Sequence, residues 1–413
     1  MLKKIRALKS GELNNYVAVF GLVAVSGFPF FVSSVNNSII LMLFVLIIFL
    51  KRSILFNTKC LGIIGAFFIV EMLHHFFIYP VPLATMIGTL VRLSAAFLVI
   101  SICDKKFTYY YVNLMYCLAI ISFIFFLPSI LSVAFKDFFI NVICPYFTPI
   151  WGSNSESSGF YVTEPTIIIY TFHEALQEFR NSGPFWEPGA FSVFLNIALM
   201  FNIINTKALW NKKNIYFAIA IISTLSTTGF LAFFVIVASF YLVKEKISKS
   251  VFIFALFFPI VVFLFFNLEF LNSKISTNME LKDNTTSRFG SAAADLKDFV
   301  TSPLIGWGKG EMRYGGRPFT FFTVDQHRNN GLTSLLVTYG IVVFTVLLYN
   351  YLKTLTVLCL ANNFNRIFAL LFFIVILMLG FGEPIFQYPF FYSIMFIHLF
   401  YTKEETFTIG KRI

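Results

Sequence analysis

Long apolar runs constrain this chain more than any other feature of its sequence. Of its 413 residues, 58% are hydrophobic and only 12% are charged, whereas a soluble domain is close to half apolar and a quarter charged. Apolar runs of 18 or more residues are typical of helices that cross a bilayer, where the backbone has to satisfy its own hydrogen bonds. We therefore predict an all-α polytopic integral membrane protein, with residues 1–413 forming a single membrane domain.

The apolar runs predict about twelve transmembrane helices. The candidate spans are 14–33, 38–50, 60–79, 83–103, 108–134, 186–205, 215–227, 229–243, 251–271, 331–352, 367–381 and 385–401. Two longer polar stretches, 135–185 and 272–330, interrupt the pattern.

The positions of Lys and Arg predict the orientation in the membrane. Basic residues gather in alternate connections, whereas 33–37 and 80–82 carry no charge and 382–384 carries only Glu383. Cytoplasmic connections collect Lys and Arg, so both termini are expected in the cytoplasm and both polar stretches outside. The same asymmetry explains the net charge of +11 without a nucleic-acid partner.

The segment 215–243 decides between two topologies. A hairpin that breaks at Ser226–Gly229 preserves the alternation of charge, and we favour it. One long tilted helix would give eleven spans and would invert everything that follows. Each arm of the hairpin is short of a full bilayer, so the tip is expected to be buried against protein.

Cysteine spacing gives no sign of a metal or redox site. The five cysteines are scattered and none forms a CxxC pair. We expect neither a metal nor a disulfide framework.

Charged residues within the predicted spans are rare, and such residues are often functional. Arg92 lies near the middle of the fourth span, and Glu71, His74 and His75 lie on the third. Two interpretations stay open at this point. One is a cationic site that reaches a lipid phosphate or a water-filled cavity, and the other is an Arg92–Glu71 pair that neutralises itself.

The first outer stretch ends in a passage suited to an anion. Arg180 and Glu187 come just before a helix that is expected to start near Pro188. Helix N-termini attract anions, and a nearby arginine adds a planar fork that can hold a phosphate. Ordinary capping of an interfacial helix is the alternative.

The second outer stretch gathers many basic side chains. They are Arg288, Lys309, Arg313, Arg317, His327 and Arg328. Residues 289–300 fit a short amphipathic helix on the membrane face, and the Gly-rich passage 306–316 predicts tight turns. His327 comes shortly before a helix and could act as a general base near neutral pH, although a solvated loop histidine is the alternative.

Four segments of the chain resemble, in order, the bacterial O-antigen and capsular polysaccharide polymerases. They are RNSGPFWEPGAFSVFL, LSTTGFLAF, SRFG followed by SPLIGWGKG, and HRNNGLTSLLVTYGIVVF. The related O-antigen ligases share the last two. The resemblance covers about residues 175–350 in motif and the whole chain in layout. No single motif is specific, but their order, spacing and shared outer location together are.

The resemblance implies a glycosyltransferase-C-like membrane fold and a metal-independent glycosyltransferase of lipopolysaccharide or capsule biosynthesis. Such an enzyme transfers a polymer from undecaprenyl pyrophosphate to a lipid-linked repeat unit, on the outer face of the bacterial inner membrane. The resemblance gives Arg180 and Arg288 the role of holding the pyrophosphate, and His327 that of activating the acceptor hydroxyl. The further candidates for substrate binding are Glu187, Arg317, Arg328, Arg313 and Arg92.

Pyrophosphate is already a good leaving group, so no cofactor is expected, and fixed arginines can stabilise its developing charge. The expected partners are the lipid-linked donor and acceptor glycans, membrane lipid and a chain-length regulator. One alternative is an O-antigen ligase that moves finished polymer to a lipid A core. An alternative from another class is a flippase or other transporter of lipid-linked oligosaccharides, which would need charged residues along its spans.

Overall fold

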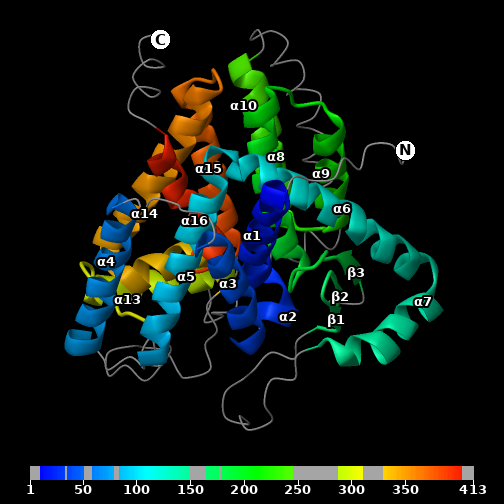
Figure 1. The fold of residues 1–413 in the computed structure, drawn as a ribbon, viewed down its shortest axis with the longest axis horizontal. Coiled ribbons are helices and arrows are strands. Elements are labelled where there is room, and N and C mark those ends of the chain that lie inside the picture. The colour runs from blue at the N-terminus through cyan, green and yellow to red at the C-terminus, as the bar shows by residue number, and fades with distance from the viewer. Residues whose placement is uncertain are drawn as a thin grey trace. The chain divides into compact units, whose positions relative to one another are not determined.

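The computed structural model describes residues 10–32, 35–50, 58–78, 83–148, 164–175, 178–244, 287–309 and 329–401. These residues are mostly helical (Figure 1). The predicted span 251–271 lies outside the described residues, as do Arg313, Arg317, His327 and Arg328.

Each of the other eleven predicted spans coincides with one or more helices. The N-terminal helices are α1 Ser10–Gly27, α2 Pro29–Val32, α3 Val35–Leu50, α4 Thr58–Leu73 with the π-helical turn η2 His74–Ile78, α5 Leu83–Cys103 and α6 Phe107–Leu131. The remaining helices of this set are α8 Pro188–Thr206, α9 Lys212–Ser223, α10 Thr227–Lys244, α14 Gly331–Ala361, α15 Arg366–Gly382 and α16 Pro389–Phe396 with η7 Ile397–Phe400.

Four helical stretches are long and apolar enough to cross a membrane. They are Thr58–Ile78, Thr85–Leu131, Pro188–Thr206 and Gly331–Ala361. Large apolar side chains are exposed on three of these stretches, whereas Pro188–Thr206 is mostly buried. Phe76 and Phe77 near the end of the first stretch are 73% and 75% exposed. Contiguous apolar surface of this kind suits lipid rather than water. A mostly helical membrane protein is therefore confirmed, while the count of twelve crossings stays a prediction.

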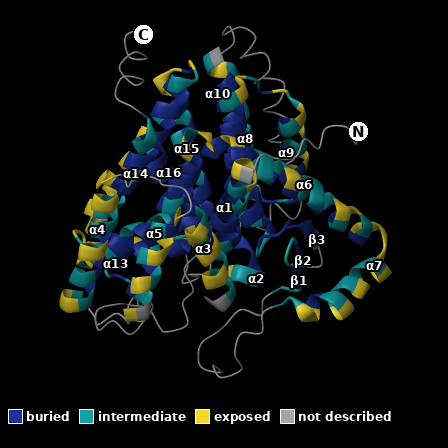
Figure 2. Ribbon diagram, in the orientation of Figure 1, coloured by how far each residue is buried: buried dark blue, intermediate teal, exposed yellow. Residues whose placement is uncertain are grey.

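The chain divides into two compact units. The first unit contains Met1–Leu61, Val91–Ser226 and Tyr388–Glu404. Its core is α8, which is buried along almost its whole length and packs against α6 and α9 (Figure 2). Aromatic rings fill this core, and Tyr111 stacks on Phe390 with 4.4 Å between ring centroids. Stacked aromatic pairs add stability beyond the area they bury.

A small antiparallel sheet in the first unit was not predicted from the sequence. Strands β1 Thr166–Ile167, β2 Tyr170–Ala175 and β3 Glu178–Asn181 follow one another in that order. They lie in the polar stretch 135–185, which also contains the short helical pieces α7 Val133–Phe138, η4 Phe139–Ile143 and η5 Cys144–Tyr146. Tyr170 and Phe172 form a hydrophobic cluster with Phe126 of α6 and Cys144. The sheet is thereby fixed to the end of a membrane helix.

The second unit contains Gly62–Leu90, Thr227–Gln387 and Glu405–Ile413. Within it α15 packs against both α10 and α14, and α14 also packs against α13 Arg288–Thr301. Helix α13 confirms the short helix expected over 289–300. Ser287 caps it, with its side chain accepting a hydrogen bond from the backbone N–H of Gly290.

Two backbone breaks have local causes. The break expected at Ser226–Gly229 is found slightly earlier, between the end of α9 at Ser223 and the start of α10 at Thr227, and Leu225 there has a φ of 47°. Helix α14 is interrupted at Gly340, where φ is 69°. Glycine adopts this left-handed conformation without the steric cost that other residues incur.

Candidate functional site

The Asn-Ser-Gly-Pro turn before α8 is a buried structural junction. Asn181 donates hydrogen bonds from Nδ2 to Ser122 Oγ at 3.0 Å and to Ser223 Oγ at 2.9 Å. Its Oδ1 accepts one from the backbone N–H of Gly183 at 3.0 Å. Gly183 has a φ of 52°, and a Cβ there would lie 2.8 Å from the ring of Phe191. The turn therefore requires glycine both for its conformation and for its space.

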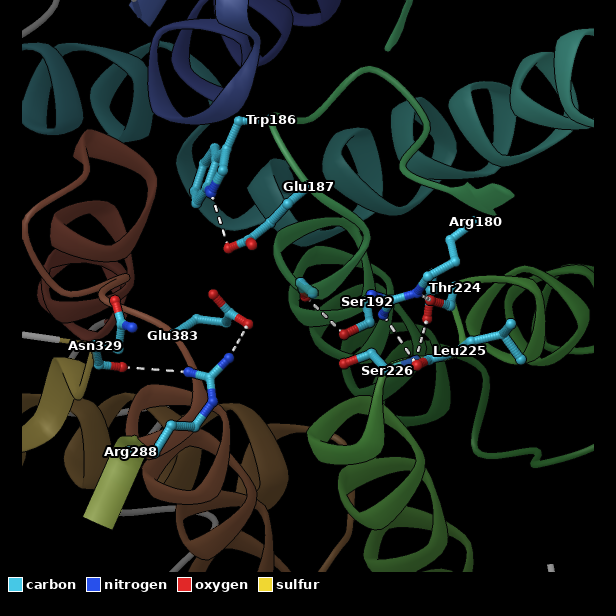
Figure 3. Close-up of polar contacts among 11 residues, drawn as sticks. Arg180, Trp186, Glu187, Ser192, Thr224, Leu225, Ser226, Arg288, Asn329 and Glu383 are labelled. Atoms are coloured by element: carbon cyan, nitrogen blue, oxygen red, sulfur yellow. Dashed lines mark hydrogen bonds and ion pairs between the residues drawn. The ribbon is translucent and has the colours of Figure 1, made fainter. Parts of the chain in front are cut away.

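Arg180, at the end of β3, is buried and holds the C-terminus of α9 (Figure 3). Its Nε donates to Thr224 O at 3.0 Å, and one terminal nitrogen donates to Leu225 O at 2.9 Å. The last carbonyls of a helix lack partners within the helix and carry a partial negative charge. These two contacts give Arg180 a structural function in this structure, and they differ from the predicted position beside the N-terminus of α8.

Glu187 is the N-cap residue of α8, with Pro188 following at the first helical position. Its carboxylate does not cap the helix. Instead Oε1 accepts a hydrogen bond from Trp186 Nε1 at 3.0 Å (Figure 3), and the Trp186 ring packs against Tyr388 with 5.1 Å between centroids. The helix start near Pro188 is confirmed, and Glu187 orients an aromatic side chain next to it.

Arg288 forms an ion pair with Glu383 in the second unit. The guanidinium lies 2.9 Å from Glu383 Oε1, and the two side chains are 22% and 4% exposed. A second nitrogen of Arg288 donates to Asn329 O at 3.2 Å (Figure 3). Charge-assisted bonds of this kind are about twice as strong as neutral ones. Arg288 thus connects the start of α13 with the residue before the cap of α14 and with the end of α15.

Close backbone packing brings α14 and α15 together at this ion pair. Asn330 caps α14, because its Oδ1 accepts hydrogen bonds from the N–H groups of Leu332 and Thr333. A Cβ on Gly331 would lie 2.2 Å from Glu383 O, so only glycine fits there. On the neighbouring turn, a Cβ on Gly382 would lie 2.5 Å from Thr228 Cγ2 of α10. The Thr-Thr-Gly segment and the Asn-Asn-Gly segment therefore meet at the same helix end.

The segment after α13 fills the break in α14. The N–H groups of Trp307 and Gly308 donate to the carbonyls of Val337 and Thr338, each at 2.8 Å. Further along, the N–H of Ile341 donates to Pro303 O at 2.8 Å. Gly306 and Gly308 have φ of 73° and 71°, a conformation that suits glycine. Most of the passage 306–316, where tight turns are expected, lies outside the described residues. Backbone groups freed by a helix break at membrane depth have to be satisfied by protein, and this loop satisfies them.

A second set of buried polar residues lies beside this break. Glu71 of α4 accepts a hydrogen bond from Tyr339 Oη at 3.0 Å, and its Oε1 lies 3.8 Å from Lys309 Nζ. Lys309 also donates to Thr89 Oγ1 at 2.8 Å. Lys309 therefore offsets the charge of the Glu71 carboxylate, and the Tyr339 hydroxyl orients it. Arg92, the other charged residue singled out within the spans, is exposed on α5.

The structure therefore brings together parts of the last three of the four motif segments, which are far apart in the sequence. Ser287–Gly290, Ser302–Lys309 and Asn329–Gly340 are joined by the hydrogen bonds above, and Thr228 packs against the helix end that carries Glu383. Sequence reasoning missed Glu383, Tyr339 and Thr89 as partners. Glu383 did leave one signal, since it is the only charge in the connection 382–384, which is predicted to be an outer one.

Comparisons with known proteins add no assignment. No protein-family model matches the chain, and no curated protein matches its sequence.

Proposed function

We propose that this protein polymerises undecaprenyl-pyrophosphate-linked repeat units into O-antigen or capsular polysaccharide on the outer face of the bacterial inner membrane. The growing chain leaves its carrier lipid and is joined to a sugar hydroxyl of a fresh lipid-linked unit. In the proposed orientation both termini are cytoplasmic and the stretches 135–185 and 272–330 are extracytoplasmic. The partners are lipid-linked donor and acceptor glycans, membrane lipid and a chain-length regulator.

The observation that carries the proposal is the meeting of the motif segments around Arg288 and Glu383. Segments of the chain that resemble the polymerases lie up to about a hundred residues apart, yet Arg288 bonds both Asn329 and Glu383. Residues that only stabilise a membrane helix have no need to connect these segments. A shared reaction centre would explain why one resemblance covers these three segments.

Arg288 is the candidate that best fits the leaving group. Its guanidinium is held in place by two partners and is 22% exposed, at the start of a helix whose macrodipole also favours an anion. Donors that are fixed before the reaction stabilise developing charge without a cost of reorganisation. Arg313, Arg317 and Arg328 are proposed to contact phosphate or sugar, together with Glu187 and Arg92. His327 is proposed to activate the acceptor hydroxyl.

Arg180 is retained as a pyrophosphate candidate only in a weaker form. Its two contacts to the carbonyls at the end of α9 already give it a structural reason to be an arginine. Any role in catalysis has to be separated from this structural one.

The glycan profile of a strain lacking this gene tests the proposal. Loss of a polymerase leaves a single repeat unit attached to its final acceptor, because transfer continues without chain growth. Loss of a ligase instead leaves long polymer on the carrier lipid. Loss of a flippase leaves lipid-linked units on the cytoplasmic face. Either of the last two profiles would contradict the proposed polymerase.

A further inference from the structure

Glu71 and His74 form a buried pair that the contacts described so far do not fully satisfy. Both side chains have no exposed surface, and they lie three positions apart at the junction of α4 with η2. Residues three apart on a helix are neighbours on one face. Figure 1 shows α4 beside α14, and the bond between Tyr339 and Glu71 joins the two helices.

The hydrogen bond of His74 fixes the state of its ring. Nε2 lies 2.6 Å from Ile305 O, and a backbone carbonyl can only accept. Nε2 therefore carries the hydrogen, and in the neutral ring Nδ1 is a bare acceptor. Nδ1 is buried and has no hydrogen-bond partner among the described residues. A histidine held through one nitrogen, with the other available to accept, has the arrangement of a general base.

Glu71 presents a second acceptor without a partner. The hydrogen bond from Tyr339 and the ion pair with Lys309 both involve Oε1 of Glu71. Its Oε2 is buried and has no hydrogen-bond partner within the described part of the chain. A buried acceptor that is left unpaired costs about 1–3 kcal/mol, so two of them on one helix face call for a donor group.

The chemistry of the pair selects the kind of donor. An anion such as phosphate is disfavoured, because both atoms are acceptors and one belongs to a carboxylate. A metal cation is disfavoured as well, since Lys309 already lies 3.8 Å from Glu71. A neutral O–H group satisfies both acceptors and brings no charge into a buried site.

We propose that Glu71 and His74 bind the hydroxyl group of the acceptor sugar and that His74 Nδ1 takes its proton. This inference rests on the proposed function, and it gives the proton transfer to His74 in place of His327. In the proposed topology His74 lies at the outer end of α4, shortly before the connection 80–82. It also begins a turn of π-helix, a conformation often found at functional sites.

The step balances as a simple group transfer. The hydroxyl oxygen bonds to the anomeric carbon of the donor glycan while the bond from that carbon to the pyrophosphate oxygen breaks. The pyrophosphate leaves with the electron pair, and the hydroxyl proton passes to Nδ1. The nearby Glu71 carboxylate stabilises the imidazolium until the proton is given up to water or to the departing phosphate.

His74→Gln separates catalysis from structure. A glutamine amide can donate to Ile305 O as Nε2 does, but it places no acceptor at the position of Nδ1. The matched control is His75→Gln, one residue further along the same π-helical turn. Each purified protein is reconstituted in proteoliposomes with lipid-linked repeat units, and kcat and KM for chain growth are measured separately.

The expected result is a loss of kcat of about 100-fold or more in His74→Gln, with KM changed little, because general-base help contributes about 10²–10⁴-fold. His75→Gln should retain wild-type turnover. Glu71→Gln should lower kcat as well, since its amide can present a donor to the hydroxyl. Wild-type kcat in His74→Gln would overturn the inference. Absence of chain growth in the wild-type protein would instead overturn the proposed function.

Discussion

The ion pair between Arg288 and Glu383 allows the structural and functional roles of Arg288 to be measured apart. At 2.9 Å the Coulomb attraction is about 6 kcal/mol for an effective dielectric constant of 20. Desolvation of both groups offsets part of this. Removing one partner leaves the other charge buried, and such losses are about 3–5 kcal/mol. Arg288→Ala should lower the free energy of unfolding by this amount, because the Glu383 side chain, 4% exposed beside Arg288, loses its counter-ion.

A double-mutant cycle with Glu383→Gln then isolates the two roles. The double variant leaves no buried charge at this position, so we expect a coupling energy of about 1–3 kcal/mol that restores part of the lost stability. Unfolding in detergent measures the stability, and the glycan profile of the complemented deletion strain measures chain growth. Polymer should stay absent in both Arg288→Ala and the double variant. Long chains in the double variant would refute the pyrophosphate role, and an unchanged stability of Arg288→Ala would refute the argument from burial.

Three further outcomes follow from the first unit. Gly183→Ala should cost about 2–4 kcal/mol of stability, because the added Cβ meets Phe191 and the φ of residue 183 is 52°. The control is Gly62→Ala, whose added Cβ meets nothing within 4 Å. Equal unfolding midpoints for the two variants would contradict the prediction. Arg180→Lys keeps the positive charge but not the planar guanidinium that bonds two carbonyls, so it should lower the stability of the protein. Normal glycan chain length in a folded variant would show that Arg180 has no role in the reaction. Burial raises the pKa of the Cys144 thiol to about 12, so maleimide should not label it at pH 8 until the protein unfolds. The test uses a Cys117→Ser variant, because Cys117 is exposed, and rapid labelling of Cys144 in that folded variant would show that Cys144 is not buried.

The same pKa shift has a defined effect on stability. The folded state holds the Cys144 proton more tightly than the unfolded state does, since burial disfavours the thiolate. The stabilising contribution is therefore fully present below about pH 9 and is lost as the pH rises toward 12.

Helices were predictable from the sequence because an apolar run long enough for a bilayer has few other solutions. The predicted start near Pro188 depended on the preference of proline for the first turn of a helix, and the short helix over 289–300 depended on its amphipathic pattern. The sheet was missed because its strands are two to six residues long. Tyr170 and Phe172 are buried by α6, and nothing in the sequence of the strands indicates that contact.

Partners of charged residues were the least predictable part of the candidate site. Glu71 was singled out as costly in a membrane, but its partners come from residues more than two hundred positions later, Lys309 and Tyr339. Arg180 was placed near a helix N-terminus by sequence distance, whereas the fold directs it to the carbonyls at the end of α9. Charge and spacing identify which residues need a partner, and tertiary packing decides which partner they receive.

Reconstitution of the purified protein tests the central claim most directly. Proteoliposomes that contain this protein and undecaprenyl-pyrophosphate-linked repeat units, with no lipid A core and no other enzyme, are sampled over time and their glycans separated by length. The account predicts a ladder of lipid-linked chains that lengthens with time and undecaprenyl pyrophosphate released in step with it. Units that stay single in the presence of folded protein would contradict the account.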